Sequence, residues 1–507
     1  MLRKNRVIVY AFTQPGNIIS AVHTRKNEEN ILPNLLKTAA LLSALSLLLA
    51  GCAQTGTLAE ETRLQDARND FVPAPATFEF AAMADSATPT DRWSGVLGGA
   101  AYRIEMPASQ WNGKLVLYAH GYAGTGKSLT VQDPPIRRFL IDNGYAWAAS
   151  SYSKNYYDVR AGVEDTNALA LAFNDIAARN GRPLPQPSKT YIFGRSMGGH
   201  IAAAAVEAET LATAKNKVRY DGAVPTCAVL DDDKLWAYFG GYQLAAQQLA
   251  GLPAASLPVN NWPQISNHVR TTLFNSTTSF ATPAPQGMLL KNIVMNLTGG
   301  QRPLFEQGFA NDGLQNVVWG TFGDDGTVRG ILNANMVDTR DVYYNFDAPE
   351  AVVAAFNASI GKSTPVPDAN RLRRDGLRWI PKVHADFSVP VLTIHTLGDM
   401  YVPFGLEQSY VARATAKGHA NLLVQRAIRG AGHCDFTVAE QARAFADLAR
   451  WVEQGVKPAG DDVATPATVA NPAYGCAFTD NTLGADDAAA VKTARVPGKL
   501  PACPALR

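Results

Sequence analysis

The stretch KTYIFGRSMGGHIAAAAVEAE, from Lys189 to Glu209, decides the fold. Its opening residues are mostly β-branched or aromatic, as in a buried strand, and its alanine-rich second half is typical of a helix. A serine stands at the turn between the two, within GRSMG (residues 194–198). Small residues at such a turn allow a strained backbone and a close approach of helix to strand. We therefore expect the Ser196 hydroxyl at the carboxyl end of a strand, where a base could activate it as a nucleophile.

Strand-like runs and helical patterns alternate on both sides of this stretch. Strands are expected at Ala101–Met106, Lys114–Ala119, Ala146–Tyr152, Lys189–Phe193, Tyr220–Val224, Pro390–His395 and Asn421–Ala427, and helices at Asp158–Asn180, Gly198–Glu209 and Thr437–Gln454. Strands that are separated by helices predict an α/β fold, with a mostly parallel sheet and helices on both of its faces.

A long insertion, residues 230–387, interrupts this alternation. It is rich in Asn, Gln and aromatic residues, and it contains helix-like segments such as Leu235–Leu249 and Ala351–Ser359. A structureless connection of this length would be implausible inside a compact domain. We therefore expect a large, mainly helical cap domain that is inserted into the sheet domain.

Two residues late in the chain are suited to activate the serine. His433 lies in GAGHCDF, between the last expected strand and the last expected helix, and Asp399 follows PVLTIHTLGD just past a strand. The G-x-S-x-G turn and the order Ser196, Asp399, His433 resemble the α/β-hydrolase superfamily of esterases and lipases. The resemblance covers about residues 101–454 and implies the α/β-hydrolase fold. It also implies that Ser196 is the nucleophile, that His433 is the general base and acid, and that Asp399 orients the histidine.

The same resemblance suggests an oxyanion hole. His120-Gly121-Tyr122 follows the strand KLVLYA, where members of the superfamily place the loop that binds the oxyanion. The backbone N–H groups of Tyr122 and Met197 would then point at the carbonyl oxygen as it becomes negative. His120 itself would hold this loop by hydrogen bonds.

Other readings of these segments remain open. Asp231, Asp232 and Asp233 follow the strand 220–224, where some relatives in the superfamily carry the acid, and such a cluster could also bind calcium. We expect them instead to be solvated charges at the start of the cap, and we expect no metal. The segment GYAGTGKS (residues 121–128) matches the phosphate-binding P-loop. No clear strand ends in a Mg²⁺-binding aspartate, so we expect no nucleotide and no other cofactor.

The N-terminus is expected to be an export signal. Lys37 precedes the mainly apolar run AALLSALSLLLA (residues 39–50), which is too short to span a bilayer but fits a secretory signal peptide. The ending Leu-Ala-Gly-Cys resembles the bacterial lipobox, which implies that Cys52 is lipidated and attaches the protein to a membrane. By the same resemblance, Ala53 rather than Asp after the cysteine favours attachment to the outer membrane, on its periplasmic or cell-surface face.

The expected organisation follows from these segments. In order, it comprises a lipoprotein signal peptide (1–52), a linker (53–90), the first part of the α/β-hydrolase core (91–229), the cap (230–387), the second part of the core (388–456) and a C-terminal tail (457–507). Six of the 46 Lys and Arg residues and two of the 44 acidic residues precede residue 53, so 40 basic residues face 42 acidic ones beyond it. This balance excludes the clustered basic face that nucleic-acid binding requires.

The cysteines indicate disulfides in an oxidising compartment. The chain has five cysteines, and lipidation of Cys52 leaves Cys227, Cys434, Cys476 and Cys503, which allow three pairings. We favour a bond between Cys227 and Cys434, because both follow strands at the carboxyl edge of the sheet, and one between the two tail cysteines. Two buried free thiols are the alternative for the first pair.

These features predict a secreted serine hydrolase. Its substrate would be a small-molecule or oligomeric carboxylic ester, and aromatic residues in the cap favour an apolar or aromatic group in that ester. A serine peptidase or amidase with the same catalytic residues is the alternative function. A binding protein built on a hydrolase scaffold is a third possibility, against which the complete set of catalytic residues speaks.

Overall fold

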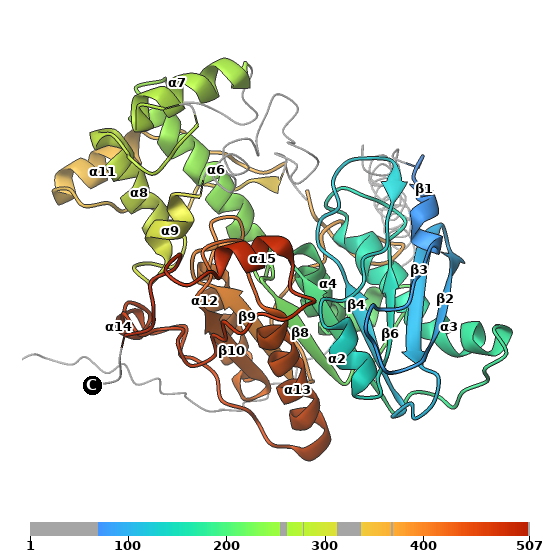
Figure 1. Ribbon diagram of the computed structural model, residues 1–507. Helices are drawn as coiled ribbons and strands as arrows, with labels where there is room; N and C mark the ends of the chain where they lie inside the picture. The colour runs from blue at the N-terminus through green and yellow to red at the C-terminus, as the bar shows by residue number, and fades with distance from the viewer. Residues whose placement is uncertain (1–68, 254–260, 277, 312–335, 367–368, 505–507) are drawn as a thin grey trace, which may run out of the picture. The chain divides into compact units, whose positions relative to one another are not determined.

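The centre of the molecule is a twisted sheet of eight strands (Figure 1). The computed structural model describes residues 69–253, 261–276, 278–311, 336–366 and 369–504. The strands, in the order β10-β9-β8-β7-β4-β6-β3-β2 across the sheet, are β2 (Thr90–Leu97), β3 (Ala100–Pro107), β4 (Lys114–Ala119), β6 (Ala146–Ser150), β7 (Lys189–Arg195), β8 (Gly222–Thr226), β9 (Val391–Thr396) and β10 (Leu423–Ile428).

Six neighbouring strands, from β6 to β10, run parallel, and β2 and β3 complete one edge in antiparallel pairing. Side chains alternate between the two faces of a strand, and β4 shows the result. Leu115 and Leu117 join a core with α3 (Val159–Arg179) and α4 (Met197–Ala205), whereas Val116 joins a second core. That second core includes residues of α2 (Arg137–Asp142) and α13 (Val438–Gln454).

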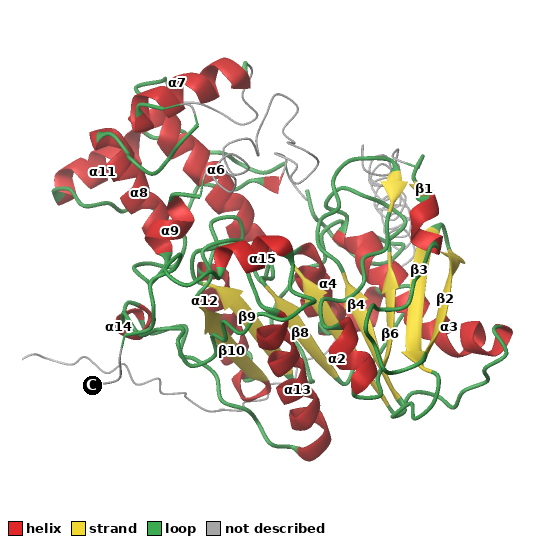
Figure 2. Ribbon diagram, in the orientation of Figure 1, coloured by secondary structure: helices red, strands yellow, loops and turns green. Residues whose placement is uncertain are grey.

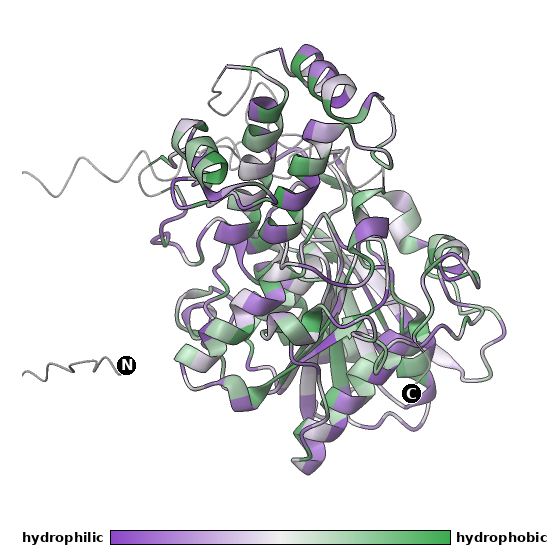
Figure 3. Ribbon diagram, turned by 90° about the vertical axis from the view of Figure 1, so that its left-hand side faces the viewer, coloured by the Kyte–Doolittle hydropathy of each residue, from purple (hydrophilic) through white to green (hydrophobic). Residues whose placement is uncertain are grey.

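Each face of the sheet is therefore covered by helices, and the strands consist largely of hydrophobic residues (Figure 3). This arrangement confirms the expected class, the α/β-hydrolase fold. The final helix, α13, illustrates how local sequence fixes an element. The Thr437 side chain accepts from the Glu440 N–H, and the Glu440 carboxylate accepts from the Thr437 N–H, so the helix starts at a capping box. Gly455, with φ of 73°, ends it in the left-handed conformation.

The helices of the expected cap lie between β8 and β9 in the chain and gather beside one end of the sheet (Figure 2). They are α6 (Asp232–Leu249), α7 (Trp262–Phe274), α8 (Pro285–Leu297), α9 (Phe305–Phe309) and α11 (Glu350–Ser359). Most cap aromatics in the described residues are buried in the hydrophobic core that the cap shares with α3, α4 and the sheet, whereas Tyr343 is 60% exposed. Trp319 and the side chain of Trp262 lie outside the described residues.

The last part of the expected cap packs against the sheet domain instead. The Arg378 guanidinium pairs with Glu209, and the amides of Ala385 and Asp386 donate to the Glu207 carboxylate. The end of the cap was not predicted, because the composition does not change where the chain leaves the cap and begins to pack against the sheet domain.

Part of the expected linker also belongs to the sheet domain. β1 (Val72–Pro73) pairs with β5 (Ser128–Leu129), and the Arg103 side chain donates to the backbone carbonyl of Thr77. The linker prediction for 53–90 therefore extended too far, because elements of two to four residues are too short to produce a periodic pattern. Residues 53–68 lie outside the described residues.

The C-terminal tail covers the edge of the sheet at β10. The Asp461 amide donates to the Gln425 carbonyl, and the Asp461 carboxylate accepts from the Ala427 amide. Val463, Val469 and Tyr474 form a small core there, so the tail has more packing than its Pro- and Ala-rich sequence suggested. Within the described part of the chain, no helix combines the length and the apolar character needed to cross a bilayer.

Candidate active site

Ser196 lies at the sharp turn between β7 and α4, with φ of 59° and ψ of −121°. Its N–H donates to the carbonyl of Thr226 on the neighbouring strand, at 2.9 Å. A Cβ at Gly194 would collide with the carbonyl oxygen of Gly198, and one at Gly198 would collide with that of Ala119. Glycine is therefore required at both positions to let the helix start so close to the strands.

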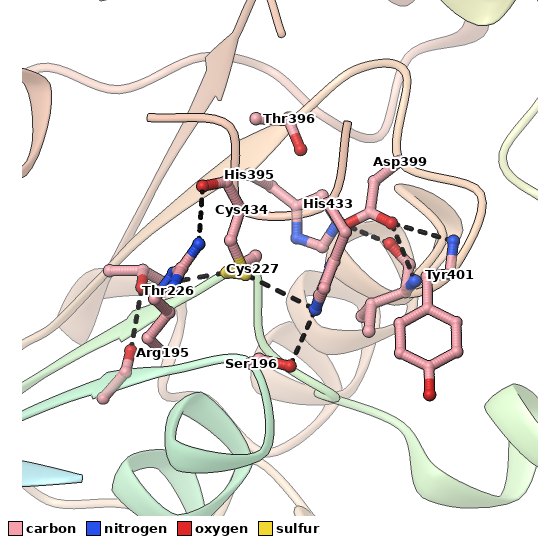
Figure 4. The surroundings of a disulfide bond; sticks show 12 residues. Arg195, Ser196, Thr226, Cys227, His395, Thr396, Asp399, Tyr401, His433 and Cys434 are labelled. Carbon is pink, nitrogen blue, oxygen red and sulfur yellow. Dashed lines mark hydrogen bonds and ion pairs between the residues drawn. A yellow bond between two sulfur atoms is a disulfide. The ribbon is translucent and has the colours of Figure 1, made fainter. Parts of the chain in front are cut away.

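Three side chains form one hydrogen-bonded line at this turn (Figure 4). The Ser196 Oγ lies 2.7 Å from Nε2 of His433. Nδ1 of His433 lies 2.6 Å from Oδ2 of Asp399. Because a carboxylate accepts only, Nδ1 carries a proton and Nε2 of the neutral ring is free to accept the serine proton.

Asp399 is fully buried in the loop that follows β9. Its second oxygen, Oδ1, accepts from the backbone N–H groups of Tyr401 at 2.8 Å and Val402 at 2.9 Å. These two bonds fix the plane of the carboxylate while Oδ2 points at His433 (Figure 4). The Tyr401 ring packs edge-on against the His433 ring, with centroids 5.3 Å apart.

The loop that carries the histidine, residues 429–436, is attached to three strands. Cys434 forms a disulfide with Cys227, just beyond β8, and the two Cα atoms are 5.3 Å apart. The Arg195 guanidinium donates to the Cys434 carbonyl at 3.3 Å, and the Thr396 hydroxyl donates to the Gly432 carbonyl at 2.8 Å. Cys476 and Cys503 form a second disulfide, within the tail. Cys52 lies outside the described residues.

The two residues expected to form the oxyanion hole flank the serine. Met197 is the first residue of α4, where backbone N–H groups have no acceptor within the helix. Tyr122 follows Gly121 in the loop after β4, and a Cβ at Gly121 would lie 3.3 Å from the Cβ of Ser196. This loop therefore runs directly beside the serine, as binding of an oxyanion would require.

Three further histidines near the site are buried and hydrogen-bonded. His120 stacks on Tyr152, with ring centroids 4.1 Å apart, and its Nδ1 donates to the Gly121 carbonyl at 2.6 Å. His200, on α4, lies between the Tyr157 hydroxyl and the Pro381 carbonyl. His395, on β9, donates from Nε2 to the Val402 carbonyl at 2.8 Å. None of the three contacts Ser196 in a hydrogen bond within the described residues.

The aspartate cluster at the start of the cap has other partners. Asp231 caps the N-terminus of α6 and pairs with Arg413 at 2.7 Å. Asp232 and Asp233 both pair with Lys382, and burial raises the pKa of Asp232 to about 6. The structure thus brings Asp399 to His433, and the three cap aspartates serve helix capping and ion pairs.

The P-loop-like segment does not fold as a phosphate-binding loop. Residues 128 and 129 form strand β5, whereas a P-loop leads directly into a helix. Lys127 is largely exposed and pairs with Asp70.

A cavity of about 660 Å³ lies between the start of α6 and cap residues 336–343, 365–366 and 369–370. Its described lining residues include Lys234, Tyr238 and Asp338 but none of the three aligned catalytic candidates. We therefore build the site on the hydrogen-bonded line and not on this cavity.

Sequence reasoning missed some residues that shape the site. Arg195 immediately precedes the serine. A cation beside a candidate nucleophile is visible in the sequence and could have marked this residue as part of the site. Tyr401 follows Asp399 by two residues, but its contact with His433 depends on a turn that no local pattern predicts. Glu407, buried on α12 (Gly405–Ala416), lies 3.3 Å from Nδ1 of His395 and gave no signal.

Comparisons with known proteins give limited similarity. No family model matches the chain. The o-phthalyl amidase of Xanthobacter agilis is 31% identical over 91 residues, which are 18% of this chain and 20% of that enzyme. The chain thus matches only about a fifth of the length of that relative.

Several solved structures resemble it in fold. Feruloyl esterase B from Aspergillus oryzae is 15% identical, with a TM-score of 0.42, and the match covers 76% of this chain and 84% of that one. Candida antarctica lipase A is 12% identical, with a TM-score of 0.36, and the match covers 73% and 80% of the two chains. The fold assignment stands on this chain's own strand order and crossovers.

Proposed function

We propose that this protein is a serine hydrolase that cleaves carboxylic esters. The observation that carries the proposal is the unbroken line from Ser196 through His433 to the buried Asp399, with heavy-atom distances of 2.7 and 2.6 Å. A serine hydroxyl becomes a good nucleophile when an oriented imidazole can take its proton, and these distances allow that transfer.

Acylation would begin when the Ser196 Oγ attacks the ester carbonyl carbon. The Oγ proton moves to Nε2 of His433, and Asp399 stabilises the resulting imidazolium through Nδ1. The carbonyl oxygen, now negative, would accept from the N–H groups of Tyr122 and Met197. His433 then gives its proton to the alcohol oxygen as the C–O bond breaks, which leaves an acyl group on Ser196.

Deacylation would repeat these steps with water. His433 takes a proton from a water molecule, whose oxygen attacks the acyl carbon, and the same N–H groups bind the oxyanion. The proton returns to the Ser196 Oγ as the acid departs. No metal or organic cofactor takes part in this sequence of steps.

An apolar or aromatic group in the ester fits the surroundings of the histidine. The Tyr401 ring contacts His433, and the cap residue Phe239 lies with its ring centroid 5.8 Å from that of Tyr401. The partly exposed Tyr401 ring is therefore the aromatic surface next to the reacting centre, and the buried Phe239 packs against it from the cap. Apolar acyl or alcohol groups gain free energy when they leave water for such a surface.

A panel of p-nitrophenyl esters with short, long and aromatic acyl groups tests the proposal. The residue 53–507 protein should hydrolyse some of them, and Ser196→Ala should lose activity by at least about a thousandfold. A fluorophosphonate should add mass only to the peptide that contains Ser196. Activity that survives in Ser196→Ala, or labelling at another residue, would refute the proposal.

Amide hydrolysis is the second candidate, and one observation favours it. The 91-residue similarity is to an enzyme whose name is o-phthalyl amidase. The same catalytic residues can release an amine if His433 protonates the nitrogen. Matched p-nitrophenyl esters and p-nitroanilides that share one acyl group, phthalyl included, separate the candidates. Faster turnover of the anilides would assign the protein as an amidase.

The export signal and the lipid anchor on Cys52 are part of the proposal. They are supported by the apolar run at residues 39–50 and the Leu-Ala-Gly-Cys ending. Both disulfides fit an oxidising compartment. Growth with labelled palmitate should label the wild type and leave Cys52→Ser unlabelled, and membrane fractionation would identify the outer membrane.

A further inference from the structure

The loop between β9 and α12, residues 397–404, carries Asp399, and we call it the acid loop. Its own turn supplies two of the bonds that hold the carboxylate, from the amides of Tyr401 and Val402. These bonds fix the carboxylate relative to the loop but do not fix the loop relative to His433. The sheet domain contributes to this through the Gly398 N–H, which donates to the Gly430 carbonyl of the histidine loop at 2.9 Å, and through His395, which donates to the Val402 carbonyl at 2.8 Å. Two other carbonyls of the acid loop are bound from the cap.

One of these carbonyls is bound by a buried arginine of the cap. Nε of Arg302 donates to the Leu397 carbonyl at 2.7 Å, two residues before Asp399. The rest of the guanidinium donates within the cap, to the Gly300 carbonyl and the Thr298 hydroxyl. Arg302 is only 5% exposed, so this is a rigid link between the cap and the acid loop.

A second carbonyl is bound by a buried tyrosine of the cap. The hydroxyl of Tyr238, on α6, donates to the Met400 carbonyl at 2.8 Å, one residue after Asp399. Gly308, on α9, packs so closely that a Cβ there would collide with the carbonyl oxygen of Gly398. The cap therefore holds the acid loop on both sides of the catalytic candidate.

Resting on the proposed function, we propose that the inserted cap positions the acid of the triad, with Arg302 and Tyr238 as positioning residues. Neither side chain contacts Ser196 or His433 in the bonds described, so both act through the backbone of the acid loop. The cap is thus part of the catalytic scaffold. A shift of about 1 Å in a catalytic group can lower a rate by roughly a hundredfold, which gives these bonds functional weight.

The charges around Asp399 give Arg302 a second effect. Asp399 faces His433 from the histidine loop and His395 from β9, whose Nε2 is 3.9 Å away, with Glu407 of α12 behind His395. The cap contributes Arg302 and Tyr238. Burial lowers the pKa of Arg302 to about 10, but its neighbours Tyr238 and Asp399 favour its charged form.

Conservative substitutions separate position from charge. Tyr238→Phe removes the bond to Met400 without a change in charge, and Arg302→Lys keeps the charge but loses the planar fork. Both should lower kcat by roughly tenfold, with KM within about twofold, and should leave the acidic limb of the pH–rate profile in place. Arg302→Gln should also move that limb to higher pH, because loss of a nearby cation raises proton affinity in the site.

Two cap variants serve as matched controls. Tyr344→Phe removes a buried hydroxyl that has no partner among the described residues, and Arg340→Lys alters an exposed arginine that pairs with Asp338. Both should keep kcat within about twofold of the wild type. Circular dichroism and thermal melting should show that all variants remain folded at the assay temperature.

The rate of fluorophosphonate labelling at Ser196 distinguishes failure of this proposal from failure of the proposed function. If the wild type is not labelled at Ser196, the proposed function is wrong. If the wild type is labelled, and Tyr238→Phe and Arg302→Lys are labelled and turn over as fast as the control variants, the cap does not position Asp399. A rise in KM at unchanged kcat would likewise overturn the positioning role, because it would indicate loss of substrate contacts.

Discussion

Cys227 and Cys434 are joined by a disulfide although 207 residues separate them in the chain. Cys434 immediately follows His433, and Cys227 lies one residue past β8, whose last residue accepts the N–H of Ser196. The disulfide therefore connects the segment that carries His433 to the part of the sheet that holds Ser196. Both cysteines have positive φ, 44° for Cys227 and 57° for Cys434, so the backbone turns sharply at each cysteine.

Loss of this disulfide should reduce catalysis as well as stability. In Cys227→Ala/Cys434→Ala, the histidine loop keeps only hydrogen bonds such as the one from Arg195, so we expect kcat to fall by roughly tenfold or more. The free energy of unfolding should fall by about 2–5 kcal/mol. Steady-state kinetics and urea denaturation measure the two effects.

The tail disulfide provides the control. Cys476→Ala/Cys503→Ala should lower stability but keep kcat within about twofold. The more exposed disulfide should be reduced first. Cys503 is exposed, whereas Cys227 and Cys434 are at most 3% exposed. Mild reductant should therefore open the tail bond first, without loss of activity. Inactivation that coincides with the first thiol pair released would contradict this order.

The assignment of the acid is tested by the same substitution at two aspartates. Asp399→Asn should lower kcat/KM by about 10³–10⁴-fold, because the amide no longer holds His433 in the tautomer that accepts the serine proton. Asp231→Asn retains a good N-cap for α6 and loses only the charge opposite Arg413, so activity should stay within a few-fold. A larger loss at Asp231 than at Asp399 would reverse the assignment.

Elements with a strong local pattern of apolar residues were predictable from the sequence. β4 begins and ends where expected, and α3 and α13 differ from expectation by one residue at each end or fewer. Their apolar runs and caps are local signals. The edge strand β2 was not predicted. Its residues are mostly half-buried, so apolar and polar side chains do not alternate clearly along it.

The three catalytic candidates could be chosen from the sequence because each follows a strand at the same edge of a parallel sheet. What surrounds them could not be derived in that way. The bond from Arg195 to Cys434 joins positions 239 residues apart, and the bond from Arg302 to Leu397 joins the cap to the acid loop. Such contacts depend on how loops pack in space, and neither periodicity nor spacing encodes them. The cysteines illustrate the same limit, because the number of cysteines alone allows three pairings.

The phosphate-loop match gives a prediction of no effect. Lys127→Ala should leave esterase kinetics unchanged, because Lys127 lies in an exposed turn before a strand and pairs only with exposed Asp70 among its described ion pairs. Neither the wild type nor the variant should bind a fluorescent ATP analogue with Mg²⁺. Saturable nucleotide binding that is lost in the variant would contradict the assignment of this segment.

His200 should make the folded protein sensitive to acid. Its Nε2 donates to the Pro381 carbonyl at 2.8 Å, so in the neutral ring Nδ1 accepts from the Tyr157 hydroxyl at 2.9 Å. Burial lowers the pKa of His200 from 6.5 to about 4, although the bond to Pro381 opposes this shift. The unfolded chain therefore binds a proton near pH 6.5 that the folded protein rejects until about pH 4.

The sign of the effect follows from linkage. A base whose pKa is lower in the folded state stabilises the fold fully at pH values above its pKa in the unfolded chain. For His200 this stabilisation is lost as pH falls from about 6.5 to 4, and the loss is at most about 3 kcal/mol. His200→Gln should lower the free energy of unfolding at pH 8, but the deficit relative to the wild type should shrink as pH falls through this window. The exposed His268 offers the control, because His268→Gln removes a histidine from the surface without removing a buried imidazole. Urea denaturation at pH 8, 6.5, 5 and 4 measures both series. A deficit for His200→Gln that stays constant across that range would show that His200 is not held in the neutral form by the fold.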